Sequence, residues 1–251
     1  MAYDGTDFAG WQRQGGPCGQ GPCRSPRRTV QAVIEGALER LHGRPAALTG
    51  SGRTDSGVHA AGQVANFYTD IDGMEAPRFT PALNSMLPGD VRILRSEEAA
   101  ADFHSRFDAK ARTYRYHIIP GRPAMPWELR YGWQTRRRPG IDRLNRYAAL
   151  LLGERDCSLF AVPRDKSRSR SRHISAAAFF PLGDTLVFEI RANAFLWKMV
   201  RSVLGTLIYY EGKGLSPEAF KDLLASGDRR LAGPTAPPQG LFLWKIDYYR
   251  L

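Results

Sequence analysis

The densest group of polar side chains in the 251-residue sequence lies between Gly50 and His59, where the chain reads GSGRTDSGVH. Its glycines allow the backbone to approach a ligand closely and to adopt conformations closed to other residues. Arg53 precedes Asp55 by two residues, so the two side chains can project toward one cavity. The alternative is an Asx-turn in which Asp55 only accepts backbone N–H bonds, and the spacing alone slightly favours it. The segment is not a nucleotide-binding P-loop, because the Lys-Ser/Thr ending of that motif is absent.

A second cluster begins with FHSRF at 103–107 and continues into a stretch where basic residues and tyrosines alternate. Its later members are Lys110, Arg112, Tyr114, Arg115 and Tyr116. Basic residues interleaved with aromatic rings on a strand suit the stacking of nucleobases and contacts with phosphates. The alternative is an exposed strand edge guarded by positive charges.

A third candidate is Arg201, which lies inside the largely apolar run 195–208. Its guanidinium either reaches the surface along its own aliphatic stem or pairs with a buried carboxylate. Metal motifs are weak, because Cys18 and Cys23 are followed by no second Cys/His pair at ligand spacing. No G-x-S-x-G nucleophile elbow is present either.

The elements that must position these residues follow from the spacing of apolar side chains. Helices are predicted over 30–41 (between Thr29 and Gly43), 141–152, 194–210 and from Ser216-Pro217-Glu218 onward, with a short one starting at Thr80-Pro81. Strands are predicted over 63–68, 91–94, 113–119, 186–191 and 241–249. Because the two kinds of element interleave, with long amphipathic helices in separate halves, we expect an α+β protein of two sheet-and-helix units.

The charge of the chain points to a polyanionic partner. The sequence has 36 Lys+Arg against 25 Asp+Glu, a formal net charge of +11. Three stretches are typical of loops: 15–28, 136–139 and 164–173. Each is a solvated surface loop or a contact with backbone phosphates, and the net charge favours the second interpretation for 164–173.

Composition excludes several other classes of protein. With 43% hydrophobic and 24% charged residues the chain is globular rather than disordered. Its apolar runs are too short for a membrane span, and its N-terminus lacks the pattern of a signal peptide. Three cysteines, at 18, 23 and 157, are too few for disulfide bonds to stabilise a fold of this size. We therefore expect a soluble protein of the reducing cytoplasm.

Read in chain order, these segments resemble the TruA-type tRNA pseudouridine synthases. The resemblance is carried by YDGT at 3–6, GWQRQ at 10–14, TVQ at 29–31, GRTDSGVHA at 52–60, LN at 83–84, LPGD at 87–90, FHSRF at 103–107, YRY at 114–116, NAF at 193–195, MVR at 199–201 and GL at 240–241. The string at 52–59 is highly specific and the matches run in order over nearly the whole chain. The sequence is therefore identified as a member of that family.

The resemblance implies isomerisation of uridine to pseudouridine in the tRNA anticodon stem-loop, at tRNA positions 38, 39 and 40, with no cofactor and no metal. By position in the motifs, Asp55 corresponds to the essential aspartate, Tyr114 to the active-site tyrosine and Arg201 to the arginine that pairs with the aspartate. Arg53 matches the motif arginine used near the RNA, and Arg106 and Arg115 are further candidates for substrate binding.

The implied chemistry accounts for these residue types. An ionised carboxylate beside the sugar and base acts either as a nucleophile or as a base at the ribose, and the sequence leaves both routes open. Burial would raise the pKa of such a carboxyl, so a paired guanidinium is needed to keep it charged. A tyrosine can stack on the flipped uracil and help to remove the C5 proton.

The resemblance also implies a fold of two RRM-like α+β halves that share one continuous mixed β-sheet, with a basic cleft between them. We expect residues 1–101 to form the N-terminal half with the aspartate motif, and residues 102–251 to form the C-terminal half that completes the cleft and the dimer interface. The partners implied are tRNA and a second copy of the chain, with no membrane.

Two features depart from the family pattern. An apolar strand usually precedes the Tyr-Asp-Gly motif, whereas only Met1 and Ala2 precede it here, so we expect a stunted first strand. Met1 is either the true start or an internal methionine of that strand. The stretch 15–28 is longer than the usual connection; its arginines either extend the RNA contact or lie in a disordered loop.

Two rival functions remain to be weighed. An RRM-like RNA-binding protein without catalysis would bind tRNA and form no product, but the presence of Asp55, Tyr114 and Arg201 together argues against it. A small-molecule hydrolase using Asp55 and His59 lacks any matching constellation.

Overall fold

The structure is a computed structural model that describes residues 1–13, 27–165 and 167–249. The chain divides into two compact units, one formed by Met1–Lys110 with Leu243–Leu251 and the other by Ala111–Phe242. Helices and strands alternate along it, and the strands make a large mixed sheet, which confirms the predicted α+β class.

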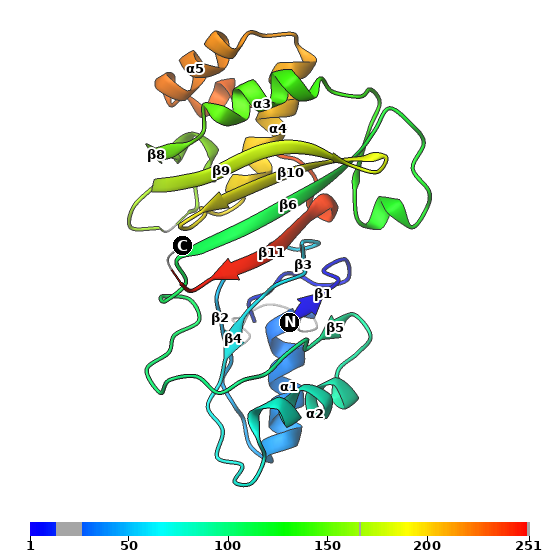
Figure 1. Cartoon of the computed structure of the whole chain (residues 1–251), viewed down its shortest axis with the longest axis vertical. Helices are drawn as coiled ribbons and strands as arrows, with labels where there is room; N and C mark the ends of the chain where they lie inside the picture. Colours follow the sequence, from blue (N-terminus) through cyan, green and yellow to red (C-terminus); the bar gives the residue numbers. More distant parts are fainter. Residues whose placement is uncertain (14–26, 166, 250–251) are drawn as a thin grey trace, which may run out of the picture. The chain divides into compact units, whose positions relative to one another are not determined.

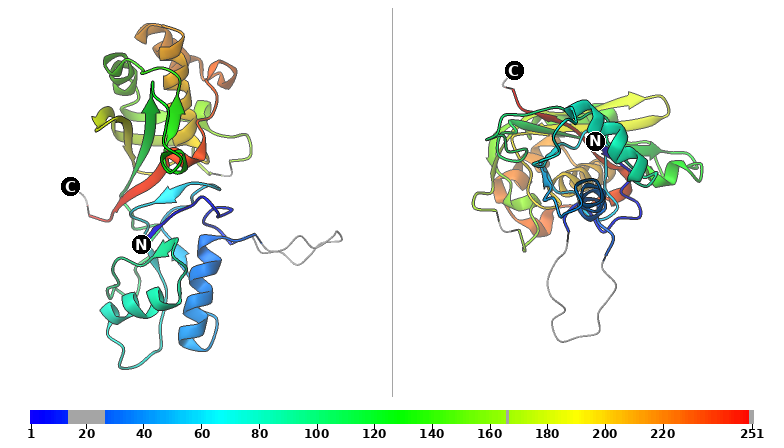
Figure 2. Two further views of the ribbon diagram at one scale, coloured as in Figure 1. Left: turned by 90° about the vertical axis from the view of Figure 1, so that its right-hand side faces the viewer. Right: turned by 90° about the horizontal axis from the view of Figure 1, so that it is seen from below.

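The first unit combines two helices with very short strands. Its helices are α1 (Val30–His42) and α2 (Phe79–Met86), which follows a 3-10 turn at Ala76–Arg78; Figure 2 shows the two helices lying together. Its strands are β1 (Ala2–Tyr3), β2 (Thr49–Gly50), β3 (His59–Ala60), β4 (Ala65–Asn66), β5 (Val91–Arg92) and the greater part of β11 (Leu241–Asp247). Strands β5, β1, β3 and β11 lie next to one another in that order, and β2 pairs with β4 in a separate small sheet.

Helix α1 has the ends that its sequence predicts. The side chain of Thr29 accepts a hydrogen bond from Ala32 N, and Gly43 ends the helix in the left-handed conformation at φ +69°. Val30, Ile34, Ala37 and Leu38 form its buried face. The cap, the apolar spacing and the final glycine therefore define this helix before any tertiary contact is considered.

The second unit contains the long strands. These are β6 (Ala111–Pro120), β7 (Trp133–Thr135), β8 (Gly153–Asp156), β9 (Ser171–Leu182) and β10 (Thr185–Ala192). Strand β10 pairs antiparallel with β6 on one side and β9 on the other, β8 pairs antiparallel with β9, and β7 runs parallel to β6 (Figure 1). Short 3-10 turns lie at Glu128–Arg130, Ser158–Phe160, Arg229–Leu231 and Pro238–Gly240.

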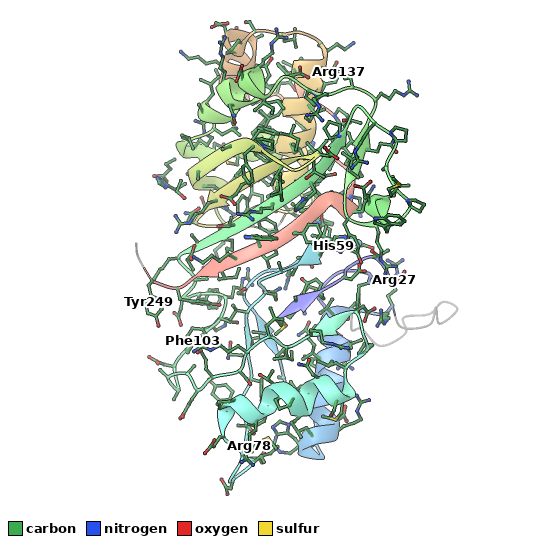
Figure 3. The ribbon with its side chains drawn as sticks, turned by 45° about the vertical axis from the view of Figure 1, so that its right-hand side comes forward. Arg27, His59, Arg78, Phe103, Arg137 and Tyr249 are labelled. Atoms are coloured by element: carbon green, nitrogen blue, oxygen red, sulfur yellow. The ribbon has the colours of Figure 1, made fainter. Side chains whose placement is uncertain are left out.

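Three helices complete the second unit: α3 (Ile141–Ala149), α4 (Met199–Gly212) and α5 (Pro217–Ser226). Helix α3 packs against β9 and against the other two helices. Glu211 of α4 accepts hydrogen bonds from Gly140 N, just before α3, at 3.0 Å and from Arg137, which Figure 3 labels in the basic turn 136–139. This nearly buried carboxylate therefore ties that turn to the helix layer.

Several predicted boundaries are wrong. The helix predicted over 194–210 begins only at Met199, because Lys198 adopts a left-handed conformation at φ +62°. The helix predicted over 141–152 ends at Ala149, and Leu152 is exposed. The strand predicted over 63–68 is reduced to Ala65–Asn66. Strand β9 was not predicted, and it includes Ser171–His173 of the stretch expected to be a loop.

Two expectations concern the start of the chain. The first strand, β1, has two residues, which agrees with the short first strand that the sequence predicts. The stretch 15–28 lies outside the described residues up to position 26, together with Cys18 and Cys23. Among the residues that are described, no helix is both long enough and apolar enough to cross a membrane.

Candidate active site

Asp55 lies in the first unit, on the connection between β2 and β3, and its side chain is half-buried. Neighbouring residues of this connection are hydrogen-bonded to the N-terminal segment of the chain. Trp11 N donates to Thr54 O at 3.1 Å, and the hydroxyl of Tyr3 contacts Thr54 Oγ1 at 2.8 Å. Ser56 Oγ donates to Phe8 O at 3.1 Å. Thr54, before Asp55, is therefore held by Tyr3 and Trp11, and Ser56, after it, is held by Phe8.

Two glycines make this close packing possible. Gly10 has φ +105°, and a Cβ on it would lie 2.7 Å from Thr54 O, so only glycine fits against the backbone next to Asp55. A Cβ on Gly50 would lie 2.4 Å from the ring of Trp11. The indole of Trp11 therefore occupies the position where a side chain of residue 50 would be.

A buried hydrogen-bond network supports the start of the same connection. Ser51 Oγ donates to Gln63 Oε1 at 2.8 Å, and Gln63 Nε2 donates to Gly52 O at 2.8 Å. Both side chains are fully or almost fully buried. The motif residues before Asp55 are thus held by a glutamine for which the sequence analysis assigned no function.

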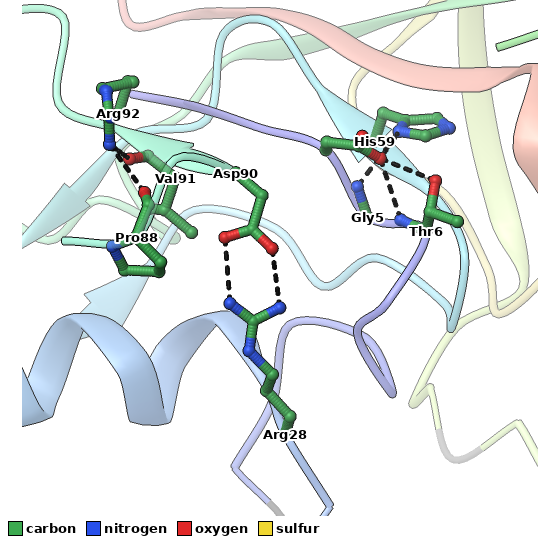
Figure 4. A network of polar contacts seen from close by, with 9 residues as sticks. Gly5, Thr6, Arg28, His59, Pro88, Asp90, Val91 and Arg92 are labelled. Atoms are coloured by element: carbon green, nitrogen blue, oxygen red, sulfur yellow. Dashed lines mark hydrogen bonds and ion pairs between the residues drawn. The ribbon is translucent and has the colours of Figure 1, made fainter. Parts of the chain in front are cut away.

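His59 has a structural role in this unit. Its ring is fully buried, and its Nδ1 accepts a hydrogen bond from Gly5 N at 3.0 Å (Figure 4). Figure 4 also shows the two parallel hydrogen bonds that Arg28 donates to Asp90, at 2.6 and 2.9 Å. These bonds raise the pKa of Arg28 and anchor the chain immediately before α1. The burial of His59 argues against a hydrolase that would use it with Asp55.

The two other basic candidates of the first unit are exposed. Arg53 donates through Nε to Gln12 Oε1 at 3.0 Å. Arg106 lies over the exposed ring of Phe107, 5.6 Å from its centroid. The turn that carries Arg106 is fixed, since Ser105 Oγ donates to Thr49 O at 2.7 Å and Ser105 O accepts from Tyr248 at 2.8 Å.

Tyr114 and Arg115 lie in the second unit, on opposite faces of β6. The ring of Tyr114 is largely buried and meets the ring of Phe195 edge-on, with centroids 5.0 Å apart. Arg115 Nε donates to Glu189 Oε2 at 2.7 Å on the directly opposite position of β10. Because alternate residues of a strand point to opposite faces, Arg115 does not share the face of Tyr114. Its role in substrate binding stays a prediction.

Arg201 also lies in the second unit, in the first turn of α4. It is half-buried, and its Nε donates to Ala236 O at 2.8 Å. The structure thus places Arg53, Asp55 and Arg106 in the first unit and Tyr114, Arg115 and Arg201 in the second. The first unit supplies a carboxylate and two guanidinium groups, and the second supplies an aromatic ring and two further guanidinium groups.

The residues that hold these side chains were not predicted from the sequence. Gly10 and Gln63 support the Asp55 connection, and the segment 233–240 (GPTAPPQG) contacts Arg201. The sequence signals for that segment are its density of proline and glycine, which is typical of turns, and the family match at Gly240-Leu241.

The stretch 164–173 is partly ordered by hydrogen bonds. Asp165 accepts from Ser167 N at 2.8 Å and from Trp197 N, next to Lys198, at 2.6 Å. Burial alone would raise the pKa of Asp165, but these hydrogen bonds lower it below its usual value. Arg172 is buried, contrary to the expectation of a fully solvated loop, whereas Arg164 and Arg168 are exposed.

No group of three or more His, Cys, Asp or Glu side chains that could hold a metal ion occurs among the described residues. Cys157 is buried, and burial raises the pKa of its thiol to about 11, so the thiol is un-ionised at neutral pH. The candidate positions themselves carry carboxylate, phenol and guanidinium groups.

Comparison with known proteins gives one consistent result. The model of the tRNA pseudouridine synthase family matches residues 1–108 and 147–249. The chain is 51% identical to tRNA pseudouridine synthase A of Treponema denticola over 248 aligned residues, which make up 99% of this chain and 91% of that protein. It is 47% identical over 234 residues to tRNA pseudouridine synthase A of Treponema pallidum, with 93% and 82% covered. The protein of the same name from Exiguobacterium is 37% identical over 251 residues, with 100% and 97% covered. The chain therefore belongs to the tRNA pseudouridine synthase family.

Proposed function

We propose that this protein isomerises uridine to pseudouridine in the anticodon stem-loop of tRNA, at tRNA positions 38, 39 and 40, with Asp55 as the active-site carboxylate. The observation that carries the proposal is the connection around Asp55. It contains the family string GRTDSGVH, and its backbone is held on both sides of the aspartate by the N-terminal segment. Such a fixed carboxylate suits a reaction that depends on positioning.

The reaction is an internal rearrangement that needs no external reagent. The bond between C1′ of the ribose and N1 of uracil breaks, the uracil rotates, and a bond forms between C1′ and C5. The proton on C5 is then lost and N1 gains a proton, so the product is an isomer of the substrate. Asp55 either attacks as a nucleophile or removes a proton from the ribose; both routes need the ionised carboxylate.

The other candidate residues support these steps. Arg201 pairs with Asp55 and keeps it ionised, since a permanently charged guanidinium can hold a carboxylate through two hydrogen bonds. Tyr114 stacks on the uracil after it leaves the helix and assists removal of the C5 proton. Flipping the base costs a few kcal/mol, which stacking and phosphate contacts offset. Arg53, Arg106 and Arg115 contact the RNA.

The partners follow from the same proposal. A protein with a net charge of +11 suits tRNA, and the enzyme acts in the cytoplasm as a homodimer that holds one tRNA across both subunits. The N-terminal half, 1–101, carries the aspartate, and the C-terminal half, 102–251, completes the cleft and the dimer interface.

The test compares Asp55→Asn with Asp72→Asn, which makes the same chemical change at an exposed site in the first unit. Release of tritium from tRNA containing 5-tritiated uridine reports turnover, and a filter-binding assay reports tRNA affinity. We expect Asp55→Asn to abolish tritium release without weakening tRNA binding, because the amide keeps the shape but not the charge. We expect Asp72→Asn to behave as the unmodified protein.

Two results would contradict the proposal. Turnover of Asp55→Asn close to that of the unmodified protein would remove the aspartate from the mechanism. Binding of tRNA without tritium release by the unmodified protein would instead indicate an RNA-binding protein without catalysis. Mapping pseudouridine in tRNA from cells that lack the protein would test positions 38, 39 and 40 directly.

A further inference from the structure

The segment 233–240 lies against both α4 and β6 of the second unit at distances that exclude side chains. A Cβ on Gly205 of α4 would lie 1.8 Å from Pro234 O, and one on Gly233 would lie 2.8 Å from Gly205 O. At the other end, a Cβ on Gly240 would lie 2.5 Å from the ring of Tyr116 in β6. The segment is therefore packed backbone to backbone on the helix and backbone to ring on the strand.

Hydrogen bonds fix the segment at the level of Arg201. Ala236 N donates to Arg201 O at 3.0 Å, while Arg201 Nε donates to Ala236 O at 2.8 Å. One residue of the segment thus binds both the backbone and the side chain of the arginine. Gly233 N donates in addition to Thr206 Oγ1 at 3.1 Å, five residues further along α4.

The bond from Nε determines how the guanidinium is oriented. Because the guanidinium is planar and rigid, a hydrogen bond from Nε–H to Ala236 O directs the Nε edge at the segment and restrains the direction in which Nη1 and Nη2 point. A carboxylate that binds this arginine through two bonds then meets it end-on, at Nη1 and Nη2, since Nε is already used by Ala236.

Tyr116 fixes the residue next to Ala236. Its hydroxyl donates to Pro237 O at 2.7 Å, and its side chain is completely buried. Burial raises the pKa of this phenol, and the nearby charge of Arg201 opposes the rise only in part, so the hydroxyl keeps its proton at neutral pH. Tyr116 is thus a permanent donor to the backbone that holds Arg201.

We propose that Tyr116, through the 233–240 segment, is a positioning residue that sets the orientation of the Arg201 guanidinium for the reaction. The inference rests on the proposed function, in which Arg201 pairs with the catalytic Asp55. It assigns a role to a residue in the same strand as Tyr114 that does not itself contact substrate.

The test compares Tyr116→Phe with Tyr210→Phe. Tyr210 is a matched control because its ring is also buried and its hydroxyl also donates to a carbonyl, that of Leu231, at 3.4 Å. We expect Tyr116→Phe to lower kcat for tritium release about tenfold, which corresponds to about 1.4 kcal/mol in the barrier, with KM for tRNA nearly unchanged. We expect Tyr210→Phe to leave both constants near those of the unmodified protein.

A double-mutant cycle with Arg201→Lys separates positioning from general loss of stability. Lysine has a single nitrogen, so it cannot donate to Ala236 O and also offer two further nitrogens to a carboxylate. The orientation that the 233–240 segment gives to the guanidinium is therefore already lost in the Arg201→Lys variant. We therefore expect Tyr116→Phe to lower kcat by less than about twofold in the Arg201→Lys background. If the kcat losses of Tyr116→Phe and Arg201→Lys multiplied in the double variant, the inference would be overturned. Equal kcat values for Tyr116→Phe and Tyr210→Phe would overturn it as well.

A readout that does not depend on activity keeps this inference distinct from the proposed function. The Nε–H proton of Arg201, observed by nitrogen-15 NMR, should exchange slowly with water in the unmodified protein and in Tyr210→Phe, and faster in Tyr116→Phe. If Tyr116→Phe does not fold, Pro237→Ala serves instead, because it keeps the carbonyl but loosens the backbone. Unchanged exchange in the folded variant would overturn the positioning role, whereas absent tritium release by the unmodified protein would overturn only the function.

Discussion

At the scale of single residues, Asp55 is held by its neighbours in space rather than by a helix or strand. The alternation of Arg53 and Asp55 and the glycines around them could be read from the sequence, because they are adjacent in the chain. Gly10 and Gln63 could not, since their roles depend on segments that meet only in the folded unit. The sequence therefore predicts the reactive group but not the residues that fix its position.

Gly10→Ala tests how tightly the connection must be held. We expect it to lower the free energy of unfolding by about 2–3 kcal/mol, through strain at positive φ and overpacking against Thr54 O, and to lower kcat through displacement of Asp55. Gly73→Ala is the control, because Gly73 has φ +79° but open space around it, and we expect it to cost only about 1 kcal/mol. Urea unfolding and tritium release check both; equal losses of stability and activity in the two variants would be evidence against the close packing.

At the scale of elements, the sequence predicts the ends of a helix well where a capping residue lies directly beside it. It does not predict them where the rest of the fold sets the end of the helix. Helices α1 and α5 begin directly after Thr29 and Ser216, whose side chains cap them, as the sequence predicts. The predicted start of helix α4 is too early, because the apolar pattern of the helix also runs through the residues before Met199, which form a turn that ends at Lys198. Strand β9 (SRHISAAAFFPL) was not predicted, because the serine and arginine at its start are typical of a loop.

Lys198→Gly tests the strained start of α4. Lys198 is the one non-glycine residue with positive φ among the residues that the structure describes, and glycine adopts that conformation without the penalty of a side chain. We expect the substitution to raise the free energy of unfolding by about 0.5–1 kcal/mol. Lys213→Gly, at the right-handed end of the same helix, should lower it by a similar amount, about 0.5–1 kcal/mol. Urea denaturation measures both, and destabilisation by Lys198→Gly would contradict the strain.

At the scale of the whole molecule, the net charge of +11 is the property that bears on tRNA. Part of the positive charge is paired with carboxylates of the same chain, as in the ion pairs of Arg28 with Asp90 and of Arg115 with Glu189. The sequence predicts the total, but the partners of each arginine depend on tertiary structure. Arg164 and Arg168, which are exposed, and Arg170, which is half-buried, are therefore the candidates for phosphate contacts in the stretch 164–173.

Replacing Arg164, Arg168 and Arg170 with glutamine tests this assignment. Each phosphate contact adds roughly 0.7–0.9 to the slope of log affinity against log salt concentration, so we expect the slope for tRNA binding to become shallower. Arg230→Gln is the control, because Arg230 is paired with Asp228, and its slope should match that of the unmodified protein. An unchanged slope in the triple variant would show that this loop does not contact phosphates.

The return of the last strand to the first unit has a consequence for synthesis of the chain. Strand β3 lies between β1 and β11, and β11 enters the first unit only at Leu243. On the ribosome the whole of Ala111–Phe242 is made first, an interval on the order of ten seconds at ordinary rates of elongation. During that interval one edge of β3 is unpaired and open to other strands, so the nascent first unit is a natural client for chaperones until the final residues emerge.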